Sequence, residues 1–288
     1  MSATRRRFSP EALFAISGIC QYSGAVIAVR LFDEVRPATV AMFRVALAAI
    51  PILLISWRSQ RRWTRADVLA AAVFGIATAL MNLFFYLAID RLPLGKSVVI
   101  EFIGPIAVAA WFTRTRRNTG ALLLAVTGVL ILSGVEVGGD PLGIFFIFCA
   151  SMMWATYIVL GRRVAALERG LSGLGVGLVI GGVFLLPFGA KGSMAVLTDT
   201  NLLLRCFAVA VLSSAIGYGI DQVVLRRIPV RRFAVLMALL PVTAMAVGFM
   251  ALHQRPSAFD LLGAALVITG VLVQDRDELP TLPDELPA

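Results

Sequence analysis

Apolar stretches of about membrane-spanning length follow one another along this sequence with only short connections between them. A transmembrane helix needs about 20 mostly apolar residues to cross about 30 Å of hydrocarbon. Ten stretches meet this requirement, at 11–31, 38–57, 67–89, 93–112, 119–135, 141–160, 171–189, 202–222, 232–252 and 257–274. They leave no room for a soluble domain, so the sequence predicts an all-α polytopic membrane protein.

The charge of the chain sets its expected orientation. Only 15% of the residues are charged, yet the formal net charge is +9. With the N-terminus taken as cytoplasmic, 18 of the 26 Lys and Arg residues fall in inside loops and seven in outside loops. This is the positive-inside pattern. It predicts a multi-pass protein of the cell (inner or plasma) membrane with both termini in the cytoplasm, and it accounts for the basic charge without a nucleic-acid partner.

An internal repeat divides the chain into two halves. A shift of 136 residues superimposes Arg91-Leu92-Pro93-Leu94 on Arg227-Ile228-Pro229-Val230, and it carries Pro105 onto Pro241. The expected organisation is a cytoplasmic N-terminus (1–10), a first five-helix repeat (11–137), a second (138–274) and a disordered cytoplasmic tail (275–288). Because five is odd, the two repeats should be inverted, an architecture common in secondary transporters. The alternative is a duplication that only built a stable bundle.

The two repeated prolines lie inside predicted spans. Proline lacks the backbone donor that a helix needs and clashes with the preceding turn. The helices that contain Pro105 and Pro241 are therefore predicted to bend.

Several motifs resemble a known family. Glu101-Phe102-Ile103-Gly104-Pro105 after Pro93-Leu94-Gly95 resembles the threonine and homoserine exporter branch of the EamA-type proteins, within the drug/metabolite transporter superfamily. Asn82 to Ile89, Gln21 and Trp154 to Ile158 support the likeness, which spans roughly 11–274. The resemblance implies a ten-helix inner-membrane exporter of small metabolites such as amino acids. Leu240, where those exporters carry a carboxylate, and His253-Gln254, in place of Gly-Glu, leave the cargo open.

Ionisable groups are rare within the predicted spans. Arg44 and Glu101 both fall roughly 10–12 Å below the outer boundary at about 1.5 Å rise per residue. A buried charge usually faces a cavity or a partner. One interpretation is a structural ion pair; the other is a site for a zwitterion, with the guanidinium on its carboxylate and Glu101 on its ammonium.

Polar and aromatic residues at helical spacing extend this candidate site. Asn82 and Tyr86 are four residues apart and share a helix face, and the 136 shift carries them to Tyr218 and Gln222. A symmetric lining of a central cavity is therefore predicted. The full set of candidate substrate-binding residues is Gln21, Arg44, Asn82, Tyr86, Glu101, Trp154, Tyr157, Tyr218 and Gln222. Ordinary helix packing is the alternative for each Tyr or Trp.

Other conspicuous residues receive structural interpretations. Asp90 and Asp221 fall near predicted helix ends, where solvent should reach them. Gly173, Gly177 and Gly181 recur every four residues and predict a close helix-packing face. The single histidine, at 253, gives little support to a metal centre or a catalytic triad, so no cofactor is expected.

The sequence thus predicts a secondary transporter that exports small polar metabolites of the threonine or homoserine type. Glu101 is the expected coupling residue of a proton antiport, in which the substrate ammonium and a proton exchange at one carboxylate. Alternatives are transport of another solute, such as a nucleobase, a sugar derivative or a drug, an intramembrane enzyme, and a non-transporting scaffold. The lipid bilayer and a small-molecule substrate are the expected partners, and a homodimer is one of the assemblies that the sequence allows.

Overall fold

The computed structural model describes residues 9–56, 63–92, 94–132, 140–166, 171–243, 246 and 257–274, all helical apart from short turns and connections. The first four helices are α1 (Pro10–Leu31), α2 (Pro37–Ser56), α3 (Arg65–Ile89) and α4 (Leu94–Glu101). They are followed by α5 (Ile103–Phe112), α6 (Arg116–Leu132), α7 (Pro141–Ala166), α8 (Ser172–Phe184), α9 (Leu186–Gly189) and α10 (Ser193–Thr198). The last are α11 (Thr200–Val209), the π-helix η2 (Ala210–Ile216), α12 (Gly217–Leu225), α13 (Val230–Leu236) and α15 (Ala258–Val273).

Five of these helical segments are long and apolar enough to cross a membrane by length and composition: Pro10–Leu31, Pro37–Ser56, Arg65–Ile89, Pro141–Ala166 and Thr200–Leu225. The other predicted ranges contain shorter helices. The range 171–189, expected as one helix, is divided after Phe184 into α8 and α9. The predicted N-terminal segment apart from residues 9 and 10, the tail 275–288 and His253 lie outside the described residues.

The helices that contain Pro105 and Pro241 are both interrupted one turn before the proline, whereas α2 continues unbroken through Pro51. The first break falls at Phe102, between α4 and α5, and Pro105 follows three residues later. The second falls at Met237 and Ala238, just before Pro241. A proline at position i cannot donate to the carbonyl of residue i−4, so each helix loses one hydrogen bond at this turn. The 136 shift therefore carries one helix break onto the other.

The surface and the interior have the polarity expected of a protein surrounded by lipid. Large apolar side chains are exposed along the helices, among them Leu54, Ile55 and Trp111. Polar side chains such as Arg44 and Asn82 are instead buried in the centre. Because lipid tails are as apolar as the exposed leucines, the packing between helices must depend on close fit and polar contacts.

Glycines allow such a fit between α3 and α8. A Cβ at Gly181 would lie 2.5 Å from the carbonyl oxygen of Gly75, and one at Gly177 would lie 2.8 Å from that of Ala71. The two backbones are therefore in direct contact, and the packing face predicted from the glycine spacing is confirmed at these two positions. Gly173 is also buried.

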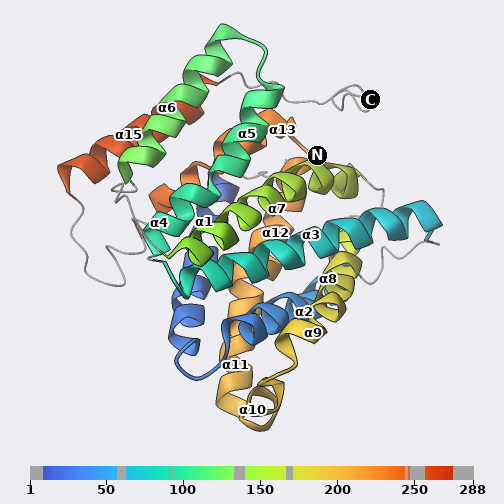
Figure 1. Ribbon diagram of the computed structural model, residues 1–288. Coiled ribbons are helices and arrows are strands. Elements are labelled where there is room, and N and C mark those ends of the chain that lie inside the picture. The colour runs from blue at the N-terminus through green and yellow to red at the C-terminus, as the bar shows by residue number, and fades with distance from the viewer. Residues whose placement is uncertain are drawn as a thin grey trace, which may run out of the picture.

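Figure 1 shows which helices pack against one another. The helix α3 packs against α7 and α8, and the segment α11–η2–α12 packs against α1 and α2. The pair α6 and α15 lies side by side at one edge of the molecule, and α5 packs against α13.

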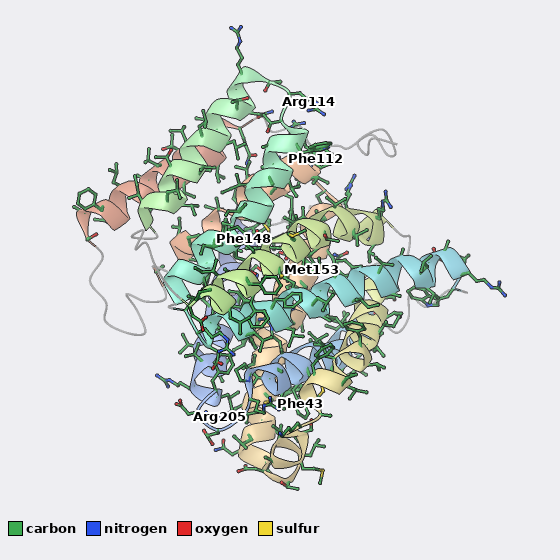
Figure 2. The ribbon with its side chains drawn as sticks, viewed as in Figure 1. Phe43, Phe112, Arg114, Phe148, Met153 and Arg205 are labelled. Atoms are coloured by element: carbon green, nitrogen blue, oxygen red, sulfur yellow. The ribbon has the colours of Figure 1, made fainter. Side chains whose placement is uncertain are left out.

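Ion pairs join helix ends that the predicted topology puts on the same side. Arg232 at the start of α13 pairs with Glu11 at the start of α1, at 2.7 Å. Arg205 in α11 pairs with Glu34 after α1, at 2.6 Å. Arg114 and Arg205, predicted on opposite sides of the membrane, lie at opposite ends of the molecule (Figure 2).

Candidate functional site

A cavity of about 80 Å³ lies in the centre of the bundle and has walls from both halves of the chain. Several water-sized groups fit into such a volume. Six of the nine predicted site residues line it: Gln21, Arg44, Asn82, Glu101, Trp154 and Tyr218. The rest of the wall is formed by Tyr22, Ala25, Met81, Phe85, Val98, Phe102, Asp221, Met237 and Leu240.

Arg44 of α2 is held by three hydroxyl groups. Its Nε donates to Ser214 Oγ at 2.9 Å, Nη1 donates to Tyr86 Oη at 3.2 Å, and Nη2 donates to Tyr218 Oη at 3.2 Å. The guanidinium carbon also lies 5.4 Å from the ring centre of Tyr86 and 5.8 Å from that of Tyr218. All these partners are neutral, so the site keeps the positive charge of Arg44, and two of its five N–H groups stay available.

The hydroxyl of Tyr218 connects the two halves. Asn82 Nδ2 donates to it at 2.9 Å and also donates to the carbonyl of Thr78 at 2.7 Å. Asn82 and Tyr218 are the pair that the 136-residue shift superimposes. Two equivalent residues of a repeat can touch each other only where the halves meet.

Glu101 ends α4 in the cavity wall, and its side chain is 8% exposed. Within the described part of the chain it forms neither an ion pair nor a hydrogen bond. Arg44 and Glu101 are therefore not in ion-pair contact, although each charge still acts electrostatically on the other. The cavity presents a cation whose hydrogen-bond partners are all neutral and a carboxylate that has no hydrogen-bond partner within the described residues.

The π-helix η2 positions the residues behind Arg44. Besides Ser214, it carries Ser213, whose Oγ donates to the carbonyl of Gln21 at 3.1 Å. The side chain of Gln21 donates to Ser17 Oγ at 2.9 Å. A π-helical turn changes the rotation of all residues after it, and such turns occur frequently at functional sites. No feature of the sequence predicts this π-helical turn.

Three predicted site residues lie behind the cavity wall rather than in it. Tyr86 is fully buried and supports Arg44. Tyr157 is fully buried between Phe74 and Tyr218, with ring centres 5.2 and 5.3 Å away. Gln222 is 1% exposed, and neither of its side-chain polar atoms has a hydrogen-bond partner in the described structure.

The prediction that solvent reaches Asp221 is wrong. It lies within α12, four residues before the helix ends, is 1% exposed and lines the cavity. The predicted span ended at 222, whereas the helix continues to Leu225. Two signals point to Asp221 in retrospect: it is three residues from Tyr218 on the same face, and the 136 shift relates it to Phe85, another residue of the wall.

Comparison with known proteins identifies the family. Residues 141–274 match the EamA-like transporter family. The threonine/homoserine exporter RhtA of Salmonella typhimurium strain SL1344 is 32% identical over 263 residues, which cover 89% of this chain and 87% of the relative. The chain belongs to the EamA-like transporter family. It is thus a multi-pass membrane protein of the drug/metabolite transporter superfamily that resembles the RhtA branch.

Two further relatives agree with this chain in length, and one solved structure agrees with it in fold. RhtA of Escherichia coli K12 is 31% identical over 262 residues, covering 90% of this chain and 88% of the relative. The uncharacterized inner membrane transporter YicL of Salmonella typhimurium strain LT2 is 22% identical over 281 residues, covering 91% and 93%. A solved crystal structure superimposes with a TM-score of 0.69 at 16% identity, over 91% of this chain and 95% of that one.

Proposed function

We propose that this protein is a secondary transporter that exports small zwitterionic metabolites, foremost amino acids of the threonine and homoserine type, across the cell membrane by proton antiport. The observation that carries this proposal is the cavity with Arg44 on one wall and the unpartnered Glu101 on another. The names of the RhtA relatives supply the direction and the substrate class.

The recognition follows from charge complementarity. A guanidinium forms short, charge-assisted hydrogen bonds with a carboxylate, with two parallel N–H groups where geometry allows. The two N–H groups of Arg44 that the protein leaves free would take the carboxylate of an amino acid. Glu101 would take the ammonium, and Gln21 and Asn82 offer polar partners to a side-chain hydroxyl.

Exchange at Glu101 would provide the coupling. A carboxylate inside a bundle is stable when it is neutralised by a proton or paired with a cation. The substrate ammonium and a proton would therefore compete for Glu101, so that one leaves when the other binds. This competition is the basis of the proposed antiport.

We further propose that the chain forms ten membrane spans in two inverted repeats, with the halves at 11–137 and 138–274 and both termini in the cytoplasm. In this arrangement α3 corresponds to the segment α11–η2–α12, α7 corresponds to α1, and α8 corresponds to α2. The contacts of α3 with α7 and α8 are then equivalent to the contacts of α11–η2–α12 with α1 and α2. Exchange of the halves maps the pair α6 and α15 onto itself. Alternating access would then arise when one half moves against the other around the central cavity.

Transport assays with the intact protein test this function. Inside-out vesicles that contain the protein should take up labelled threonine and homoserine when their lumen is acidic, and vesicles without the protein should not. A panel with nucleobases, sugar derivatives and cationic drugs tests the alternative solutes. Transport of one of these and of no amino acid would refute the proposed substrate class, whereas lack of transport for the whole panel would favour a scaffold or an intramembrane enzyme.

A further inference from the structure

Asp221 is a second carboxylate of the cavity, and its surroundings differ from those of Glu101. Tyr157 Oη donates to Asp221 Oδ2 at 2.9 Å. The other oxygen, Oδ1, is sealed from the cavity and has no hydrogen-bond partner in the described structure. One carboxyl oxygen of Asp221 is thus hydrogen-bonded, and the other is enclosed without a hydrogen-bond partner.

The enclosure limits which cation can neutralise Asp221. A substrate ammonium or a metal ion needs space beside the oxygen that it pairs with, and Oδ1 has none in this conformation. A proton needs no such space, because it forms a covalent O–H bond. An ionised carboxylate with one enclosed, unpartnered oxygen is very costly, and proteins usually avoid that state by neutralising the group.

The seam between α12 and α7 contains further unsatisfied atoms. Gln222, next to Asp221, has both its amide oxygen and its amide nitrogen buried without partners. The seam is closed by the ring of Tyr157 and by Arg162, whose Nη1 donates to the carbonyl of Leu225. Water between α12 and α7 could hydrogen-bond to these atoms, so hydration would favour a conformation in which this seam opened.

We propose that Asp221 is a proton-binding residue of the transport cycle, which holds a proton while the α7–α12 seam is closed and releases it when the seam opens to water. This inference rests on the proposed antiport and adds a second proton site to it. Protonation is then linked to conformation, because the closed state binds the proton more tightly than the open one. Glu101 binds the substrate, and Asp221 carries a proton in each cycle.

The other charged and titratable groups around α12 are already engaged or lie across the cavity. From α7 they are Tyr157 and Arg162, from α1 Tyr22, from α2 Arg44, from α3 Tyr86 and from α4 Glu101; α12 itself carries Tyr218, and α13 carries Arg231 and Arg232, the latter paired with Glu11. The helices η2 and α8 contain no titratable side chain. No basic side chain hydrogen-bonds to Asp221 within the described residues, so a proton is the available source of positive charge.

Proton stoichiometry in proteoliposomes tests this proposal. With the membrane potential clamped at zero, each proton exchanged per substrate supports about tenfold accumulation for a gradient of one pH unit. Asp221→Asn should therefore lower the accumulation ratio about tenfold while pH-independent exchange of substrate remains measurable. Glu101→Gln should abolish the exchange itself. The matched control is Asp90→Asn, which removes an exposed carboxylate at the end of α3 and should keep the wild-type ratio. An unchanged ratio in Asp221→Asn would overturn the proposal.

A spectroscopic measurement covers the case in which Asp221→Asn does not fold or the wild type transports no amino acid. Infrared spectra of the wild-type protein, labelled with ¹³C at the aspartate carboxyl carbon, should show the carbonyl band of a protonated aspartic acid at neutral pH. The band should persist in Glu101→Gln. Absence of a protonated aspartate from the wild-type spectrum would refute the role of Asp221, whereas absence of amino-acid transport with the band present would refute only the proposed substrate class.

Discussion

Replacement of Arg44 by lysine tests the proposed substrate site most directly. The substitution keeps the positive charge but replaces a planar group with five N–H donors by a compact ammonium. In the structure three of these donors are directed to Ser214, Tyr86 and Tyr218, which lie on different elements. A lysine ammonium cannot hold three separated hydroxyls and at the same time present two parallel N–H groups to a ligand.

The expected loss follows from the contacts. Arg44→Lys should remove one charge-assisted hydrogen bond to the substrate carboxylate, worth about 1.5–3 kcal/mol. This corresponds to a rise in Kd of about 10-fold to 150-fold. Equilibrium binding of labelled threonine, or of another solute that the wild type transports, to purified protein in lipid nanodiscs measures the change.

A matched control separates this effect from the general consequences of the substitution. Arg205→Lys makes the same chemical change in a partly exposed ion pair with Glu34, where ion pairs contribute about 0–1 kcal/mol. The Kd for the substrate should stay within about twofold of the wild-type value, which is a small change in binding free energy. If Arg44→Lys also binds the substrate with the wild-type Kd, Arg44 does not hold the carboxylate and the proposed recognition is wrong.

Three further predictions concern coupling, topology and packing. Glu101→Gln keeps the shape of the side chain but cannot ionise, and should abolish uptake driven by an imposed pH gradient in inside-out vesicles; transport at the wild-type rate would exclude Glu101 as the coupling residue. In a variant without Cys20, Cys149 and Cys206, single cysteines placed in 58–65 or 226–232 should resist impermeant thiol reagents in intact cells, and labelling from outside would contradict the orientation. Gly75→Val should lower the thermal stability by about 1–3 kcal/mol or more, because a Cβ there would lie 2.0 Å from the carbonyl oxygen of Gly177. Gly120→Val, with no atom within 4 Å of the added Cβ, should melt at nearly the wild-type temperature, and equal melting of the two variants would show that α3 and α8 can separate at no cost.

Two features of the fold follow directly from short stretches of sequence. The loss of a backbone hydrogen bond before Pro105 follows from a missing donor, which any helix would lose there. The close approach of α3 and α8 follows from the spacing of Gly177 and Gly181, because only small residues admit such contact. Both are properties of a few neighbouring residues and do not depend on the rest of the fold.

The hydrogen-bond partners of the polar residues in the cavity could not be predicted from the sequence. The sequence identified Arg44 and Glu101 as unusual because charge in an apolar span is costly wherever the span lies. It could not identify the hydroxyls of Tyr86, Tyr218 and Ser214 as the partners of Arg44. Those partners come from α3, α12 and η2, and their meeting depends on how three distant segments pack.

Local chemistry thus determined the helical, membrane-embedded character of the chain, the hydrogen bonds lost at its internal prolines and the presence of polar groups in its interior. The tertiary structure alone decided that Asp221 is sealed in the cavity wall and that Tyr157 and Gln222 lie behind it. The physical reason is rotation: each residue added to or removed from a helical turn moves the following side chains by about 100°. The π-helix η2 precedes Asp221 and packs against α1 and α2, so the direction in which α12 presents Asp221 depends on these tertiary contacts.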